Sequence, residues 1–183
     1  MAVAGDLSPP RVPFDVAEAD RCYDVWGFNC GPAAICAVTG KSPEEIRAHL
    51  GDFESKRYTN PTLMLRALRS MGISHVCTQS QGPTLALEWP KWGLVRIQWA
   101  GPWTRPGVPI PARYRHTHWV ATHIGDPGIG RGVFDINAIE AGGWIPFWAW
   151  KDRLVPLILE SVPRSSGDWW PTHSIELEDR SVG

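Results

Sequence analysis

The first part of the chain places its apolar residues at helical spacing. Side chains three and four positions apart share one face of a helix, so this pattern predicts helices that pack on a core. It predicts three of them: from Cys30 to a stop at Gly40, from the capping box Ser42-Pro43-Glu44-Glu45 to Gly51, and from Pro61 to Met71 behind a cap at Thr59 or Asn60.

After residue 92 the apolar residues recur at every second position, as they do in β-strands. Alternation of apolar and polar residues predicts strands over 93–99, 118–124 and 132–137, the last two joined by a turn at Asp126-Pro127-Gly128. Helices followed by an antiparallel sheet indicate an α+β fold, with the N-terminal helices packed on one side of the sheet.

Length and composition leave room for one domain. A chain of 183 residues, of which 43% are hydrophobic and 20% charged, buries a single core more readily than two. Residues 1–20 lack a period and contain scattered prolines, which predicts an extended N-terminal arm. We assign the domain to residues 21–161, and the polar segment 162–183 to a C-terminal extension that docks through its tryptophans.

Charge and hydropathy argue against several kinds of partner. The net charge of −1 at pH 7 leaves no basic footprint for nucleic acid. The sequence has neither a membrane-spanning apolar stretch nor the pattern of a signal peptide, so we expect no membrane contact and a cytoplasmic or virion-associated location. Four unevenly spaced cysteines without a CxxC pair indicate reduced thiols rather than disulfides or a zinc ribbon.

The predicted hairpin brings a histidine to a carboxylate. Around a turn at 126–128 the numbers of opposite residues add up to about 253 to 255, so His118 faces residues 135–137. Asp135 and Asn137 share one face of their strand, and either side chain would orient the imidazole.

Cys30 stands at the start of its predicted helix. The positive end of the helix dipole favours the thiolate, and the free backbone N–H groups there supply half an oxyanion hole. With His118 as base, such a cysteine is a candidate nucleophile. His116 and His118 also have a spacing that suits zinc, with Cys30 or Asp135 as a further ligand, but no other ligand cluster is visible and we predict neither a metal nor another cofactor.

Three blocks of sequence resemble a known family. Asn-Cys-Gly-Pro-Ala at 29–33, His-Trp-Val at 118–120 and Val-Phe-Asp-Ile-Asn-Ala at 133–138 are similar to papain-like cysteine peptidases, more narrowly to compact bacterial and phage peptidases of the bacteriocin-processing type. The resemblance implies a papain-like fold and a thiol hydrolase that cleaves a peptide or isopeptide bond in a peptide or protein substrate. It also implies the roles of the triad: Cys30 as nucleophile, His118 as base, and Asp135, or else Asn137, as the orienting residue.

The chain departs from this family at one position. Family members carry a glutamine six residues before the cysteine, and its amide completes the oxyanion hole; this chain has Asp24 there. A carboxylate would repel the developing oxyanion, and the loss of one donor typically lowers the rate on the order of 10²- to 10³-fold. We therefore consider other residues for the oxyanion and substrate side: Tyr23, Asn29, Gly31 and Gln98.

Tryptophans gather after the predicted third triad residue. The run Trp144, Phe147, Trp148 and Trp150 either covers the sheet as core, shields the contact between His118 and Asp135 from water, or forms a substrate subsite, and Trp119 allows the same alternatives.

A second hypothesis belongs to another class of function. The aspartate in place of glutamine and the Trp- and Pro-rich ends are also typical of a catalytically weak or inactive papain-like module, which binds through its N- and C-terminal arms in a larger assembly such as a phage particle.

Overall fold

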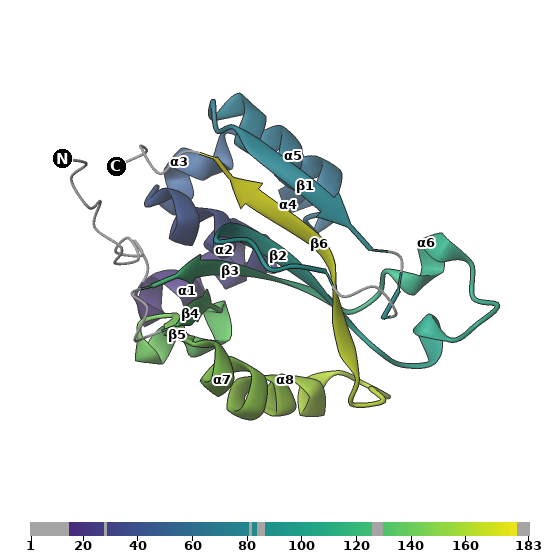
Figure 1. Cartoon of the computed structure of the whole chain (residues 1–183). Coiled ribbons are helices and arrows are strands. Elements are labelled where there is room, and N and C mark those ends of the chain that lie inside the picture. The colour runs from purple at the N-terminus through teal and green to yellow at the C-terminus, as the bar shows by residue number, and fades with distance from the viewer. Residues whose placement is uncertain (1–14, 28, 81, 84–86, 126–129, 179–183) are drawn as a thin grey trace.

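A six-stranded antiparallel sheet forms the centre of the molecule (Figure 1). The computed structural model describes residues 15–27, 29–80, 82–83, 87–125 and 130–178. Across the sheet the strands follow the order β1 (His75–Gln79), β6 (Trp169–Leu177), β2 (Trp92–Trp99), β3 (Thr117–Ile124), β4 (Arg131–Phe134) and β5 (Trp144–Pro146). The α+β class is therefore confirmed.

Short helices surround this sheet. The α-helices are α1 (Val16–Trp26), α2 (Cys30–Thr39), α3 (Pro43–Arg47), α4 (Phe53–Lys56), α5 (Pro61–Ser70), α6 (Ile110–Arg113), α7 (Phe147–Ala149) and α8 (Val155–Ser161). The described residues also form the 3-10 helices η1 (Pro102–Thr104) and η2 (Ile136–Ala141) and the π-helix η3 (Trp150–Leu154). Within the described part of the chain, no helix is both long enough and apolar enough to cross a membrane.

Local sequence signals explain several of these boundaries. Both hydrogen bonds of the capping box at Ser42 are present, and Asn60 rather than Thr59 caps α5 by accepting from the N–H of Leu63 at 2.8 Å. The second predicted helix stops at Arg47 instead of Gly51. The third predicted strand stops at Phe134, because the following residue caps η2. The predicted turn at 126–128 lies outside the described residues.

The predicted N-terminal arm is wrong for residues 16–20. The Asp15 side chain accepts from the N–H of Glu18 at 2.8 Å and starts α1, which buries Ala19 and Trp26. The sequence pattern missed this helix because it exposes most of its residues and has a weakly apolar face. Residues 1–14 of the predicted arm lie outside the described residues.

The predicted C-terminal extension is wrong as well. Residues 169–177 form β6, a central strand that pairs with β1 on one side and β2 on the other. Pro171 suggests an irregular segment, but it sits where the register against β2 shifts, and there a missing N–H is tolerated. Ile175 and Leu177 are buried, so this segment belongs to the core of the domain.

Helices pack on both faces of the sheet rather than on one. The first face carries α1, α2 and α5 over a core that includes Leu94 and Trp119. On the second face the continuous helical run α7–η3–α8 packs Trp150 and Val155 against Val95. Figure 1 shows this run below the sheet, on the side away from α2 and α5. The sequence analysis did not assign a helix to residues 147–161.

Candidate active site

Cys30 begins α2, whose remaining residues are buried against the first face of the sheet. The next residue, Gly31, allows a close approach of the neighbouring loop: a Cβ there would lie 2.0 Å from Oγ1 of Thr59. Trp119 fixes the same loop because its Nε1–H donates to the Thr59 carbonyl at 2.9 Å. Cys30 itself is half-buried. The close packing at Gly31 and the hydrogen bond from Trp119 together hold the loop at Thr59 against the start of α2, and so fix the surroundings of Cys30.

His118 lies near the start of β3 and is only 7% exposed. Its Nε2 is 2.9 Å from Oδ2 of Asp135, and since a carboxylate only accepts, Nε2–H is the donor. Trp99 of β2 stacks on the imidazole with a ring separation of 5.9 Å. The contact that the hairpin pattern predicts between His118 and residues 135–137 is present, although β4 itself ends one residue earlier.

Asp135 is completely buried and its two carboxylate oxygens are fully used. Besides His118, the indole Nε1–H of Trp150 donates to Oδ2 at 2.9 Å. The backbone N–H and the side-chain amide of Asn137 both donate to Oδ1, each at 2.9 Å. Asp135 therefore contacts the imidazole directly, and Asn137 holds Asp135.

The thiol of Cys30 forms a hydrogen bond with the His118 side chain and accepts from the backbone N–H of Trp119. Burial would raise the pKa of Cys30, but these bonds and the charge of the imidazolium bring it below its ordinary value. Burial would lower the pKa of His118, but the charge of Asp135 and the hydrogen bonds to Asp135 and Cys30 raise it to about 10. The arrangement favours a thiolate beside an imidazolium.

In the other three cysteines the surroundings raise the pKa of the thiol instead of lowering it. Burial raises the pKa of Cys22 to about 12, raises that of Cys36 strongly, and raises that of Cys77. Cys30 is thus distinguished from the remaining thiols by its environment and not by its residue type.

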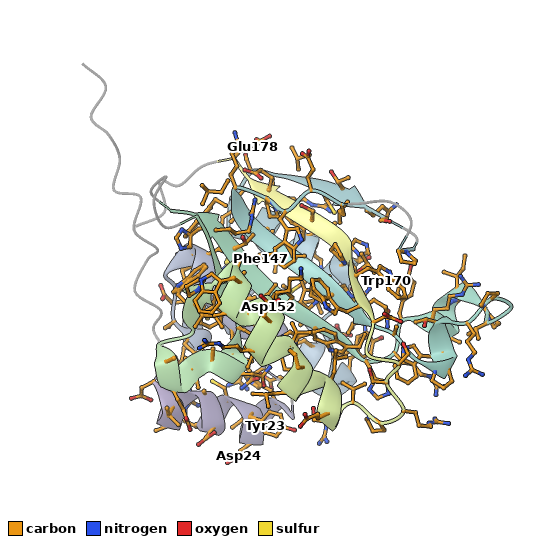
Figure 2. The ribbon with its side chains drawn as sticks, turned by 60° about the horizontal axis from the view of Figure 1, so that its bottom comes forward. Tyr23, Asp24, Phe147, Asp152, Trp170 and Glu178 are labelled. Carbon is orange, nitrogen blue, oxygen red and sulfur yellow. The ribbon has the colours of Figure 1, made fainter. Side chains whose placement is uncertain are left out.

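Position 24, where the family glutamine is missing, and its neighbour Tyr23 lie on the exposed face of α1. Tyr23 is 57% exposed, and Asp24 is exposed beside it on α1. Figure 2 shows both at the rim of the molecule. The assignment of Tyr23 to the site therefore stays a prediction, with a side chain that lies mostly in solvent.

The amide donors of Gln98 and Asn29 are engaged elsewhere. Gln98 donates through Nε2 to the carbonyls of Trp99 at 2.9 Å and Arg115 at 2.6 Å, which uses both of its hydrogens. Asn29 donates one hydrogen to the carbonyl of Ala19 at 3.1 Å. Gln98 consequently offers no hydrogen for an oxyanion, and Asn29 offers one.

The tryptophans divide between core and site. The Trp119 side chain is buried in the core, so only its backbone touches Cys30. Trp144 packs on Trp92 and His123 with ring separations of 6.1 and 4.9 Å, away from the His118 ring. The Trp119 indole is therefore core, and a substrate role for the partly buried Trp144 stays a prediction. Of the aromatic run, Trp150 reaches the triad.

Arg96 is a buried cation that the sequence analysis missed. It lies opposite Trp119 on β2, is only 5% exposed, and stands 5.0 Å from the ring centre of Tyr114. Burial lowers its pKa to about 10, while Tyr114 and Cys30 act in the other direction. Within the described ranges it has no carboxylate partner, and its Nε has no hydrogen-bond partner. Its signal in the sequence is a charged residue inside the apolar strand GLVRIQW.

A cysteine, a histidine and a buried aspartate thus form one chain of contacts. Compared with protein-family models, with curated proteins and with solved structures, the chain matches none of them.

Proposed function

We propose that the protein is a papain-like thiol hydrolase that cleaves a peptide or isopeptide bond. The observation that carries the proposal is the contact chain from Cys30 through His118 to Asp135. Its geometry supports the roles that a thiol nucleophile requires: a base within hydrogen-bond reach, and a third group that orients the base.

In the proposed reaction the Cys30 thiolate attacks the carbonyl carbon of the scissile bond. His118, protonated in the resting pair, gives its proton to the leaving amine, and the bond between carbonyl carbon and nitrogen breaks. The acyl group remains on sulfur. His118 then takes a proton from water, whose oxygen attacks the thioester carbonyl carbon. The bond between that carbon and sulfur breaks, the acid product leaves, and the Cys30 thiolate and protonated His118 are restored.

The oxyanion needs donors other than the family glutamine. The first backbone N–H groups of α2 have no acceptor within the helix and point out of its N-terminus beside Cys30. We assign the second contribution to Arg96, because it is a buried cation close enough to Cys30 for the two charges to interact.

The pH dependence of alkylation tests this proposal. Iodoacetamide labelling, followed at each cysteine by mass spectrometry, should modify Cys30 well below the ordinary thiol pKa of about 8.5 and leave Cys77 unmodified there. His118→Ala should abolish this difference, whereas His49→Ala should preserve it because His49 bonds to Ser70 on another part of the surface.

Turnover provides the second measurement. A diverse peptide library should be cleaved by the wild type and left intact by Cys30→Ala, with the folding of both proteins checked by thermal melting. Cleavage that survives Cys30→Ala would sink the proposal. Cys30 labelling like an ordinary thiol, with no cleavage by the wild type, would also sink it and would favour the inactive binding module instead.

A further inference from the structure

A pocket of about 820 Å³ opens beside the candidate active site, at the end of the sheet where β2 meets β6. Gln98 of β2 lines it, and Gln98 pairs with Thr117, the residue before His118. Tyr114, whose ring lies against Arg96, lines it as well. The pocket therefore begins at the strand position next to His118, although none of the three triad residues lines it.

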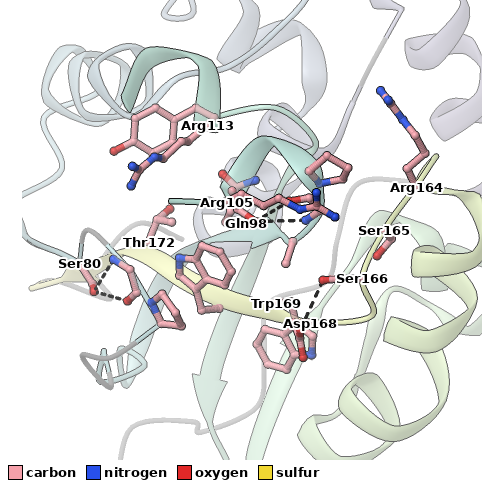
Figure 3. A pocket seen from close by; sticks show the side chains of 18 of the residues that line it. Ser80, Gln98, Arg105, Arg113, Arg164, Ser165, Ser166, Asp168, Trp169 and Thr172 are labelled. Carbon is pink, nitrogen blue, oxygen red and sulfur yellow. Dashed lines mark hydrogen bonds between the residues drawn. The ribbon is translucent and has the colours of Figure 1, made fainter. Parts of the chain in front are cut away.

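The charges around the pocket are mainly positive. Three arginines line it, Arg105, Arg113 and Arg164, against a single carboxylate at Asp168. Figure 3 shows Arg113 and Arg164 on opposite sides of the pocket with Arg105 between them. The chain as a whole has a net charge of −1, so this concentration of arginines is local to the pocket.

These arginines have no carboxylate partner among the described residues, although Nε of Arg113 donates to the carbonyl of Val108 at 2.7 Å. Arg21, Arg47 and Lys56 each form an ion pair with an acidic side chain. No such pair is found for the three pocket arginines within the described ranges, and Asp168 instead accepts from the hydroxyl of Ser166 at 3.3 Å. The pocket thus presents unneutralised guanidinium groups, which bind carboxylates well.

A buried acceptor lies in the wall of the pocket. Gln98 is only 2% exposed, its amide hydrogens are engaged, and its Oε1 has no partner among the described residues. Exchanging the amide oxygen and nitrogen would place the oxygen against two carbonyls, so the orientation is fixed. An unpaired buried oxygen accepts a hydrogen bond from a ligand N–H, such as a peptide backbone amide.

We propose that this pocket binds an acidic peptide segment of the substrate, next to the bond that Cys30 cleaves. Backbone N–H of the peptide would donate to Gln98, its carboxylates would contact Arg105 and Arg113, and its apolar parts would lie on Trp169 and Trp170. The inference rests on the proposed hydrolase function and names its substrate class. Nucleic acid requires an extended basic surface, whereas the arginines here gather in one pocket of a chain with a net charge of −1, which favours a short acidic peptide.

Binding to the full-length Cys30→Ala variant tests the inference without any dependence on catalysis. The probes are a fluorescein-labelled peptide rich in glutamate and the same peptide with glutamine at those positions, measured by fluorescence anisotropy. We expect the glutamate peptide to bind about tenfold more tightly at low salt, and this preference to shrink as salt screens the arginines.

Substitutions locate the site. Arg113→Gln and Arg105→Gln should each weaken binding of the glutamate peptide severalfold, while Arg69→Gln on the exposed side of α5 should leave it unchanged. Equal binding of the two peptides, equal effects of all three variants, or tighter binding of a polythymidine strand would each overturn the inference. Cys30-dependent cleavage of neutral peptides alongside any of those results would leave the hydrolase proposal standing.

Discussion

Burial separates the two sides of the candidate site. The imidazole side consists of His118, Asp135, Asn137 and Trp150, and the oxyanion side of Tyr23, Asp24, Asn29 and Arg96. On the imidazole side the central carboxylate is inaccessible to water and each of its oxygens accepts hydrogen bonds. On the oxyanion side, α1 turns its tyrosine and aspartate into solvent. The difference teaches that the sheet fixes the imidazole and its carboxylate firmly, whereas the oxyanion roles we propose for Arg96 and the start of α2 have no comparable network of hydrogen bonds around them.

The largest effect should come from the imidazole side. Asp135→Ala removes the acceptor of His118 and Trp150, so it should reduce turnover on the order of 10⁴-fold. Breaking a buried pair should also lower the free energy of unfolding by about 3 kcal/mol. Urea denaturation and initial rates measure the two effects.

The Asp135→Asn variant distinguishes the effect on turnover from the effect on the free energy of unfolding. It keeps an acceptor for Trp150 and the packing of the site, so it should retain most of the stability while losing a comparable amount of activity. Near wild-type turnover in Asp135→Asn would show that the carboxylate is not the orienting group.

A smaller effect should appear on the oxyanion side. Arg96→Gln removes the buried cation and should lower kcat on the order of 10²-fold, and Arg96→Lys should retain more of the rate than Arg96→Gln. Asp24→Gln, which introduces the glutamine typical of papain-like peptidases, should change kcat less than about twofold because position 24 is exposed on α1.

The pH profile of alkylation distinguishes a role in the transition state from a structural one. Cys30 in Arg96→Gln should still be labelled well below pH 8.5, because His118 stays in place. A large gain of activity in Asp24→Gln would contradict the assignment of Arg96, since it would mean that α1 reaches the oxyanion.

The smallest effect concerns stability against pH. The pKa of Cys30 lies below its ordinary value of 9.0, so its contribution to stability is present above pH 9.0 and is lost as the pH falls. The pKa of His118 rises from 6.5 to about 10, so its contribution is complete below pH 6.5 and is lost as the pH rises towards 10. These slopes oppose each other from pH 9.0 downward until the lowered pKa of Cys30 is reached, and the wild type should show a plateau over that range.

Cys30→Ala breaks that balance. Only the histidine contribution remains, so the free energy of unfolding should fall from pH 6.5 upward in urea titrations. A plateau of equal width in both proteins would show that no thiolate–imidazolium pair forms.

The sequence predicted the parts of the site that depend on local signals. The Gly-Pro break after Cys30 marks the start of a helix, and the pairing around one hairpin turn brings His118 to Asp135. The α+β class followed from the order of the helical and strand periods along the chain.

The missed features depend on contacts between distant segments. Nothing in the run Trp144 to Trp150 tells which indole will reach Asp135, because that depends on the path of the helix across the second face of the sheet. Residues 169–177 read as polar because β6 gains its stability from backbone pairing on two sides rather than from an apolar pattern of its own.

The place of β6 bears on how the chain folds. β1 pairs only with β6 in the order of the sheet, although about a hundred residues separate the two strands along the chain. Non-local pairings of this kind slow folding, because a long loop must close before the contact is gained. During synthesis the edge of β2 stays open until β6 emerges, and until then it presents unpaired backbone groups to any other extended chain.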